Sequence, residues 1–94
     1  MHIESLIWDD WNIEHIADHG VEPYEVEDVC FSRPLVRRAK KTRYGLQRYH
    51  AFGQTIAGRY LFIVLDREAA GLFYVVPARD VSKRELRQYR QKRG

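Results

Sequence analysis

The feature that most constrains the fold is a change of hydrophobic spacing at Pro34. Before Pro34, apolar side chains recur three and four positions apart, which predicts helices. After it, they alternate or run together as far as Pro77, which predicts strands. Helices followed by consecutive strands favour an α+β domain with its helices packed on a sheet. A chain of 94 residues has the size of one such domain, so we expect a single domain over 1–94.

The N-terminal third predicts a short strand and two short helices. Ile3–Trp8 carries the branched and aromatic side chains typical of a strand. A helix over Trp11–Asp18 is expected to end at Gly20, because glycine readily adopts the left-handed conformation that closes a helix. Pro23 is favoured at the first helical position, and the helix that it starts must end before Arg33, which precedes a proline.

The remainder predicts an antiparallel β-meander of three to four strands and a C-terminal helix. The expected strands are Leu35–Lys40, Leu46–Gln54, Tyr60–Leu65 and Leu72–Val76. Tyr60–Leu65 is apolar on both faces, as in a central strand. Ser82 followed by Glu85 forms a capping-box pattern, which predicts a basic helix from Lys83 to about Lys92.

The charges are divided unequally along the chain. Residues 1–32 contain nine acidic residues and no Lys or Arg, a net charge of −9. Residues 33–94 contain all 16 basic residues and four acidic ones, a net charge of +12, so the whole chain carries +3. Two interpretations are open: the basic part forms a surface for phosphate groups, or the two parts face each other in ion pairs.

Missing motifs exclude several classes of protein. The chain has no CxxC, HExxH, GxxxxGK[ST] or GxGxxG pattern, which disfavours zinc fingers, zinc proteases and P-loop or dinucleotide-binding enzymes. His15 and His19 lie four positions apart on the first expected helix, but two histidines without a third fixed ligand are a weak metal signal. We therefore expect no metal and no cofactor.

The single cysteine and the N-terminal segment indicate a compartment. Cys30 has no partner for an internal disulfide and lies among the apolar positions of the second helix, so we expect a small buried hydrophobe in a reducing environment. The chain shows no basic and apolar leader, and no apolar run long enough to span a membrane. We therefore expect a cytoplasmic protein with no membrane partner.

The residue types that remain for chemistry are histidine, arginine and tyrosine. RNA can be cleaved without a metal when its 2′ hydroxyl attacks the adjacent phosphate. That reaction needs a base, cations around the charge that develops on the phosphorane, and an acid for the leaving 5′ oxygen. The three residue types can supply these roles, although solvated arginines and aromatic rings in the core are the commoner cases.

Short motifs follow one another along nearly the whole chain. They are Trp8-Asp9, His19-Gly20-Val21, Pro34-Leu35, Arg48 five residues before Gly53, Gly58-Arg59-Tyr60-Leu61 with Val64, Arg67, Ala78-Arg79, Arg84-Glu85 and Tyr89. In order and spacing, this set resembles the BrnT-type toxins of bacterial type II toxin-antitoxin modules, small ribonucleases related in fold to the RelE and ParE toxins. The resemblance implies a RelE-like fold, an endoribonuclease that inhibits translation, and a DNA-binding, BrnA-like antitoxin that joins it in a hetero-oligomer.

Candidate site residues can be named on this basis. Arg48, Arg59 and Arg79 are expected to stabilise the phosphorane. His19 is the expected base, or His50 if His19 only caps its helix, and Tyr89 is the expected acid. The expected RNA-binding residues are Arg67, Lys83, Arg84 and Arg87.

Two further functions remain open at this level. The basic part of the chain is also compatible with a non-catalytic module that binds nucleic acid or protein. Alternatively, the acidic helices are the working surface and dock a basic partner.

Overall fold

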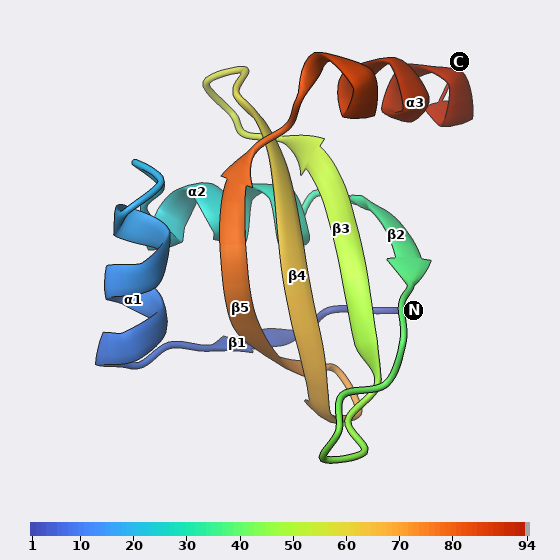
Figure 1. Ribbon diagram of the computed structural model, residues 1–94. Helices are drawn as coiled ribbons and strands as arrows, with labels where there is room; N and C mark the ends of the chain where they lie inside the picture. Colours follow the sequence, from blue (N-terminus) through green and yellow to red (C-terminus); the bar gives the residue numbers. More distant parts are fainter. Residues whose placement is uncertain (94) are drawn as a thin grey trace.

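The computed structural model describes residues 1–93 (Figure 1). The elements are β1 (Ser5–Ile7), α1 (Asp10–Ala17), α2 (Pro23–Cys30), β2 (Leu35–Arg38), β3 (Arg48–Gln54), β4 (Tyr60–Ala69), β5 (Leu72–Asp80) and α3 (Lys83–Arg93). The α+β class and the three helices predicted from sequence are confirmed. The expected domain boundary at Gly94 lies outside the described residues.

The sheet is larger and differently ordered than the expected meander. Its order is β1-β5-β4-β3-β2, with β1 parallel to β5 and the other neighbours antiparallel. The sequence predicted a meander of three to four strands with the N-terminal strand outside it, and this prediction is wrong. The N-terminal strand forms a fifth strand at the edge, because Ser5–Ile7 pairs with Leu72–Tyr74 from the other end of the chain.

The last two strands also run further than the spacing predicts. β4 continues to Ala69, and β5 passes through Pro77 instead of ending before it. Ile63 pairs with Ala78 and Leu65 with Val75, so two residues of β5 lie opposite one residue of β4. This is a β-bulge, one of the few places in a sheet where a residue without an N–H is tolerated.

Helices α1 and α2 cover one face of the sheet, and α3 lies across the end of the opposite face (Figure 1). The core lies between the first two helices and the sheet. Its fully buried side chains include Ile16, Val26, Val29, Leu61, Ile63, Leu65, Phe73 and Val75. α2 approaches β3 so closely that a Cβ at Gly53 would lie 2.8 Å from Cγ1 of Val29.

Asn12 fastens α1 to the sheet. Its side chain is fully buried, and its Nδ2 donates to the carbonyls of Ile7 in β1 and Val75 in β5. Its Oδ1 accepts from the N–H of Asp9, whose own carboxylate accepts from the Asn12 N–H and caps the helix. One buried amide therefore positions the start of the helix and two neighbouring strands.

Cys30 is buried, with 3% of its surface exposed, as the sequence predicts. Burial raises the pKa of its thiol to about 12, so the thiolate that would make it reactive does not form near neutral pH.

Candidate active site

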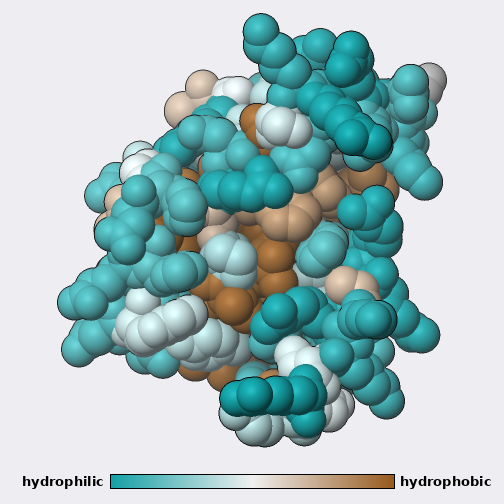
Figure 2. Space-filling view, viewed as in Figure 1, coloured by the Kyte–Doolittle hydropathy of each residue, from teal (hydrophilic) through white to brown (hydrophobic). Residues whose placement is uncertain are grey.

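The face of the sheet opposite α1 and α2 carries His50 among three arginines. β2 pairs with β3 so that Arg37 lies directly across from His50, and Arg48 lies two positions before His50 on the same strand. Arg79 reaches this face from β5, where it pairs with Phe62. Figure 2 views the molecule from this side and shows an apolar centre surrounded by hydrophilic side chains.

The surroundings of His50 favour its neutral form. Burial is the largest cause that lowers its pKa below 6.5, and the positive charges of Arg37, Arg48 and Arg79 lower it further, while Glu85 acts in the opposite direction. The imidazole also packs against the Phe62 ring, with 5.0 Å between ring centroids. A neutral imidazole at neutral pH has a nitrogen available to accept a proton.

Two of these arginines are oriented by carboxylates. Arg48 donates from Nε and Nη2 to Asp66, at 2.7 and 3.0 Å. Arg79 donates from Nη1 and Nη2 to Glu85, at 2.8 and 2.9 Å, and its guanidinium lies 4.4 Å from the centroid of the Phe62 ring. The Arg79 guanidinium holds the pKa of Glu85 down to about 2, so this carboxylate stays charged. Bidentate pairs of this kind hold a guanidinium plane in one direction.

Arg37 is absent from the residues predicted from sequence. Its guanidinium lies 5.6 Å from the centroid of the Phe52 ring, and within residues 1–93 no carboxylate forms a salt bridge with it. The available signal was the alternation in β2, which sends one of the consecutive Arg37 and Arg38 to each face. Which of the two arginines lies on the face of His50 depends on the register between β2 and β3, and the spacing of residues within β2 does not reveal that register.

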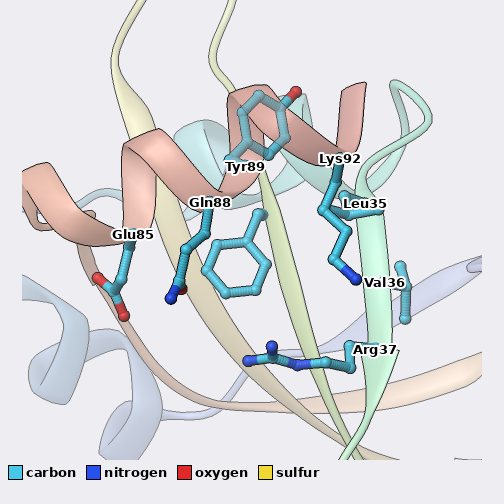
Figure 3. Close-up of a pocket in the computed structure, with 8 residues that line it drawn as sticks. Leu35, Val36, Arg37, Glu85, Gln88, Tyr89 and Lys92 are labelled. Atoms are coloured by element: carbon cyan, nitrogen blue, oxygen red, sulfur yellow. The ribbon is translucent and has the colours of Figure 1, made fainter. Parts of the chain in front are cut away.

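A hollow of about 140 Å³ separates α3 from the neighbouring strands. Figure 3 shows Gln88 and Lys92 reaching from α3 toward Arg37 of β2. Tyr89 also lines this hollow, and its ring meets the Tyr60 ring edge-on at 5.8 Å. The Tyr89 hydroxyl lies at the end of the ring that points away from Arg37 (Figure 3).

The structure places His19 and Arg59 away from His50. Arg59 Nη1 donates to the Gly20 carbonyl and to Glu25 of α2, and its Nε donates to Asp80. His19 follows α1, where its carbonyl accepts from Arg59 at 3.3 Å. These contacts join the connection between α1 and α2 to the ends of two strands, on the side of the sheet that the helices cover.

The predicted RNA-binding residues divide into two locations. Lys83, Arg84 and Arg87 are exposed on α3, outside the hollow that this helix shares with the sheet. Arg67 is exposed near the opposite end of β4, where it lines a shallow surface hollow with Tyr49. Three of the four cations therefore lie at the end of the sheet that α3 crosses, and the fourth lies at its far end.

Among residues 1–93, no group of three or more His, Cys, Asp or Glu side chains is placed to hold a metal ion. In the same part of the chain, no helix is long and apolar enough to cross a membrane.

The open sheet face of this small α+β domain presents His50 among three arginines, beside a basic helix, and such an arrangement can bind phosphate groups. Residues 8–85 match the family described as ribonuclease toxin, BrnT, of type II toxin-antitoxin systems, and the chain therefore belongs to this family. Membership in it implies an antitoxin partner. No match was found among curated proteins.

Proposed function

We propose that this chain is the toxin of a bacterial type II module and a metal-independent endoribonuclease. The observation that carries the proposal is the position of His50, held neutral on an open sheet face among Arg37, Arg48 and Arg79. In the proposed reaction, His50 takes the proton of a 2′ hydroxyl, whose oxygen attacks the adjacent phosphorus. The bond to the 5′ oxygen breaks, which leaves a 2′,3′-cyclic phosphate and a 5′ hydroxyl.

The arginines stabilise the charge that develops in this reaction. Arg48 and Arg79 are already oriented by Asp66 and Glu85, so they lose little freedom when a phosphate binds. Arg37 adds a third positive charge across from His50. Three guanidinium groups around one imidazole match a phosphorane that carries an additional negative charge.

The proton on the leaving 5′ oxygen comes from Tyr89 in this proposal. Tyr89 lines the hollow that also contains Arg37 and Glu85. Because its hydroxyl points away from Arg37, the side chain must turn toward the sheet when RNA binds (Figure 3). Replacement of Tyr89 by Phe removes the acid but retains the ring, and should lower the cleavage rate without an equal loss of RNA affinity.

His50 is the proposed base in preference to His19. His19 lies beside Arg59, whose guanidinium is already bound by Glu25, Asp80 and two carbonyls. That arrangement supports a structural role for His19 and Arg59, as a clamp between the helices and the sheet.

The wider function follows from the same proposal. Lys83, Arg84 and Arg87 hold the phosphate backbone of the RNA. Arg67 pairs with the buried Phe73 and lies on the sheet face opposite His50, so it contacts the RNA where the strand passes round the far end of the sheet. Cleavage of messenger RNA inhibits translation in the cytoplasm. A DNA-binding antitoxin of the BrnA kind blocks the site, and the fold is related to that of RelE toxins.

The test is incubation of the purified protein with a long single-stranded RNA in EDTA. We expect fragments with 2′,3′-cyclic phosphate ends from the wild type, and none from Arg79→Ala. Arg38→Ala is the matched control, because Arg38 is an exposed arginine on the neighbouring position of β2 and pairs with Tyr49 instead of His50. Cleavage that survives in Arg79→Ala, or that disappears in EDTA, would contradict the proposal.

A non-catalytic RNA-binding module is the second candidate. The exposed Lys83, Arg84 and Arg87 of α3 favour it, because they attract phosphate groups without supplying a base or an acid. In that case the wild type binds RNA and leaves it intact, and Arg79→Ala weakens binding to all sequences and reduces the salt slope by about 1.

A further inference from the structure

We propose that the hollow between α3 and the sheet binds one nucleobase of the RNA strand, and that it prefers bases with keto oxygens, guanine and uracil. This inference rests on the proposed ribonuclease function and assigns a base-recognition site to it. The residues that carry it are Phe52, Tyr89, Gln88, Lys92 and Arg37.

The hollow adjoins the proposed reaction site. It shares Arg37 with the cluster around His50, and Glu85 at its other side is the carboxylate that orients Arg79. A phosphate at His50 therefore places the neighbouring nucleoside of the same strand within reach of the hollow.

The size of the hollow suits a single planar group. Its volume of about 140 Å³ is well below the roughly 300–1,000 Å³ of pockets that enclose drug-sized ligands. Two of its walls are aromatic, Phe52 from β3 and Tyr89 from α3. Aromatic rings beside a basic surface are the usual means of holding an unstacked base.

The polar groups of the hollow are mostly donors. Lys92 and Arg37 can only donate, and Gln88 can donate from its amide nitrogen or accept at its amide oxygen. The carboxylate of Glu85 is the main acceptor, but it is already bound by Arg79 and by the N–H of Ser82. O6 of guanine and O4 of uracil accept hydrogen bonds, whereas adenine and cytosine present an amino donor at the equivalent position.

The surroundings indicate RNA in preference to a protein segment. Lys83, Arg84 and Arg87 are exposed on the helix that forms the roof of the hollow. A strand with one negative charge per nucleotide is complementary to this surface along its length. A nucleic-acid strand bound to these basic side chains therefore lies close to the hollow.

The experiment measures binding to strands that cannot be cleaved. Short 2′-O-methyl oligonucleotides of uracil, adenine or cytosine lack the attacking hydroxyl, so their affinity does not depend on catalysis. We expect the wild type to bind the uracil strand at least about fivefold more tightly than the other two. Insertion of one guanine into the adenine strand should restore most of this difference.

The variants Gln88→Ala and Lys92→Met should reduce the ratio of uracil to adenine affinity toward one. Gln54→Ala is the matched control, because Gln54 is an exposed glutamine at the end of β3 that does not line the hollow. Thermal melting followed by circular dichroism establishes that each variant is folded. An unchanged ratio, an equal loss for all three strands, or no preference in the wild type would overturn the base site.

The two proposals fail separately. RNA cleavage in EDTA with no base preference in binding overturns the base site and leaves the ribonuclease standing. A base preference that depends on Gln88 and Lys92, in a protein that leaves RNA intact, supports the base site and overturns the ribonuclease.

Discussion

The chemistry available to His50 is set by its immediate neighbours. Burial and three guanidinium groups all disfavour a positive charge on its imidazole, and the carboxylate of Glu85, already held by Arg79, opposes them only in part. A histidine in water is partly protonated near neutral pH, whereas this one is held ready to accept a proton. Arg37, on the neighbouring strand β2, contributes to the lowered pKa of His50.

The pH dependence of cleavage tests whether His50 is the base and whether its pKa is lowered. The proposed base works in its neutral form, so activity is present above the pKa of His50 and is lost as the pH falls through it. Since that pKa is lowered, we expect the acidic limb of kcat/KM below pH 6.5. Replacement of Arg37 by Gln removes one positive neighbour and should move the limb to higher pH.

The corresponding control is Arg38→Gln, which should leave the limb in place. A pH profile without an acidic limb, or a limb that moves to lower pH in Arg37→Gln, would show that His50 is not the base.

Single residues also show where prediction from sequence succeeds and where it ends. Alternation in β3 and the spacing of family motifs point to Arg48, His50 and Arg79, and the structure brings these three together. Arg59 carries the same kind of signal, but its guanidinium reaches the helices instead. Alternation along a strand assigns its residues to two faces, but it does not predict which of the two faces the helices cover.

Among the elements, α2 packs closely against β3. Gly53 makes it possible, because a methyl group there would meet Val29 at 2.8 Å. Val29 is fully buried, so it has little room to move away.

We expect Gly53→Ala to lower the free energy of unfolding by about 1–3 kcal/mol, the usual cost of overpacking. Urea denaturation measures the change. The double variant Gly53→Ala with Val29→Ala should lose less stability than the sum of the two single variants, because the smaller side chain makes room for the new methyl group. Additive losses would indicate that the contact is looser than the distance implies.

The C-terminal helix is positioned by a local and a distant interaction at once. The capping box predicted from sequence is confirmed: Ser82 Oγ accepts from the Glu85 N–H, and Glu85 Oε1 accepts from the Ser82 N–H. The same carboxylate binds Arg79 of β5. The local pair starts the helix, and the pair with Arg79 ties its first turn to the sheet face that carries His50.

For the whole molecule, the division of charge remains after folding. The pair between Arg59 and Glu25 joins the acidic segment to the basic one. Arg48 with Asp66, Arg79 with Glu85 and Arg59 with Asp80 all pair within the basic segment. The acidic helices also keep large side chains exposed, among them Trp11 at 55% and Tyr24 at 59%.

Replacement of Arg59 by Met tests its role as a clamp. Glu25, whose side chain is only 13% exposed, loses its salt-bridge partner and keeps only the N–H of Glu22, and two carbonyls lose a donor. We expect the free energy of unfolding to fall by about 1.5–3 kcal/mol in urea titrations, with kcat of the folded protein retained. Arg38→Met should change neither quantity. Normal stability with lost cleavage would place Arg59 in the active site.

The sequence by itself determined the class of the fold and the approximate limits of most elements, because caps, prolines and hydrophobic spacing act through residues that are near one another in the chain. The order and spacing of its short motifs also identified the family. Only the tertiary structure decided that Ser5–Ile7 pairs with β5, that a bulge carries β5 past Pro77, and that Arg37 lies beside His50 while Arg59 does not. These arrangements depend on contacts between distant segments. Such contacts form where apolar surfaces pack together and buried polar groups find hydrogen-bond partners. Neither of these can be predicted from the local spacing of residues.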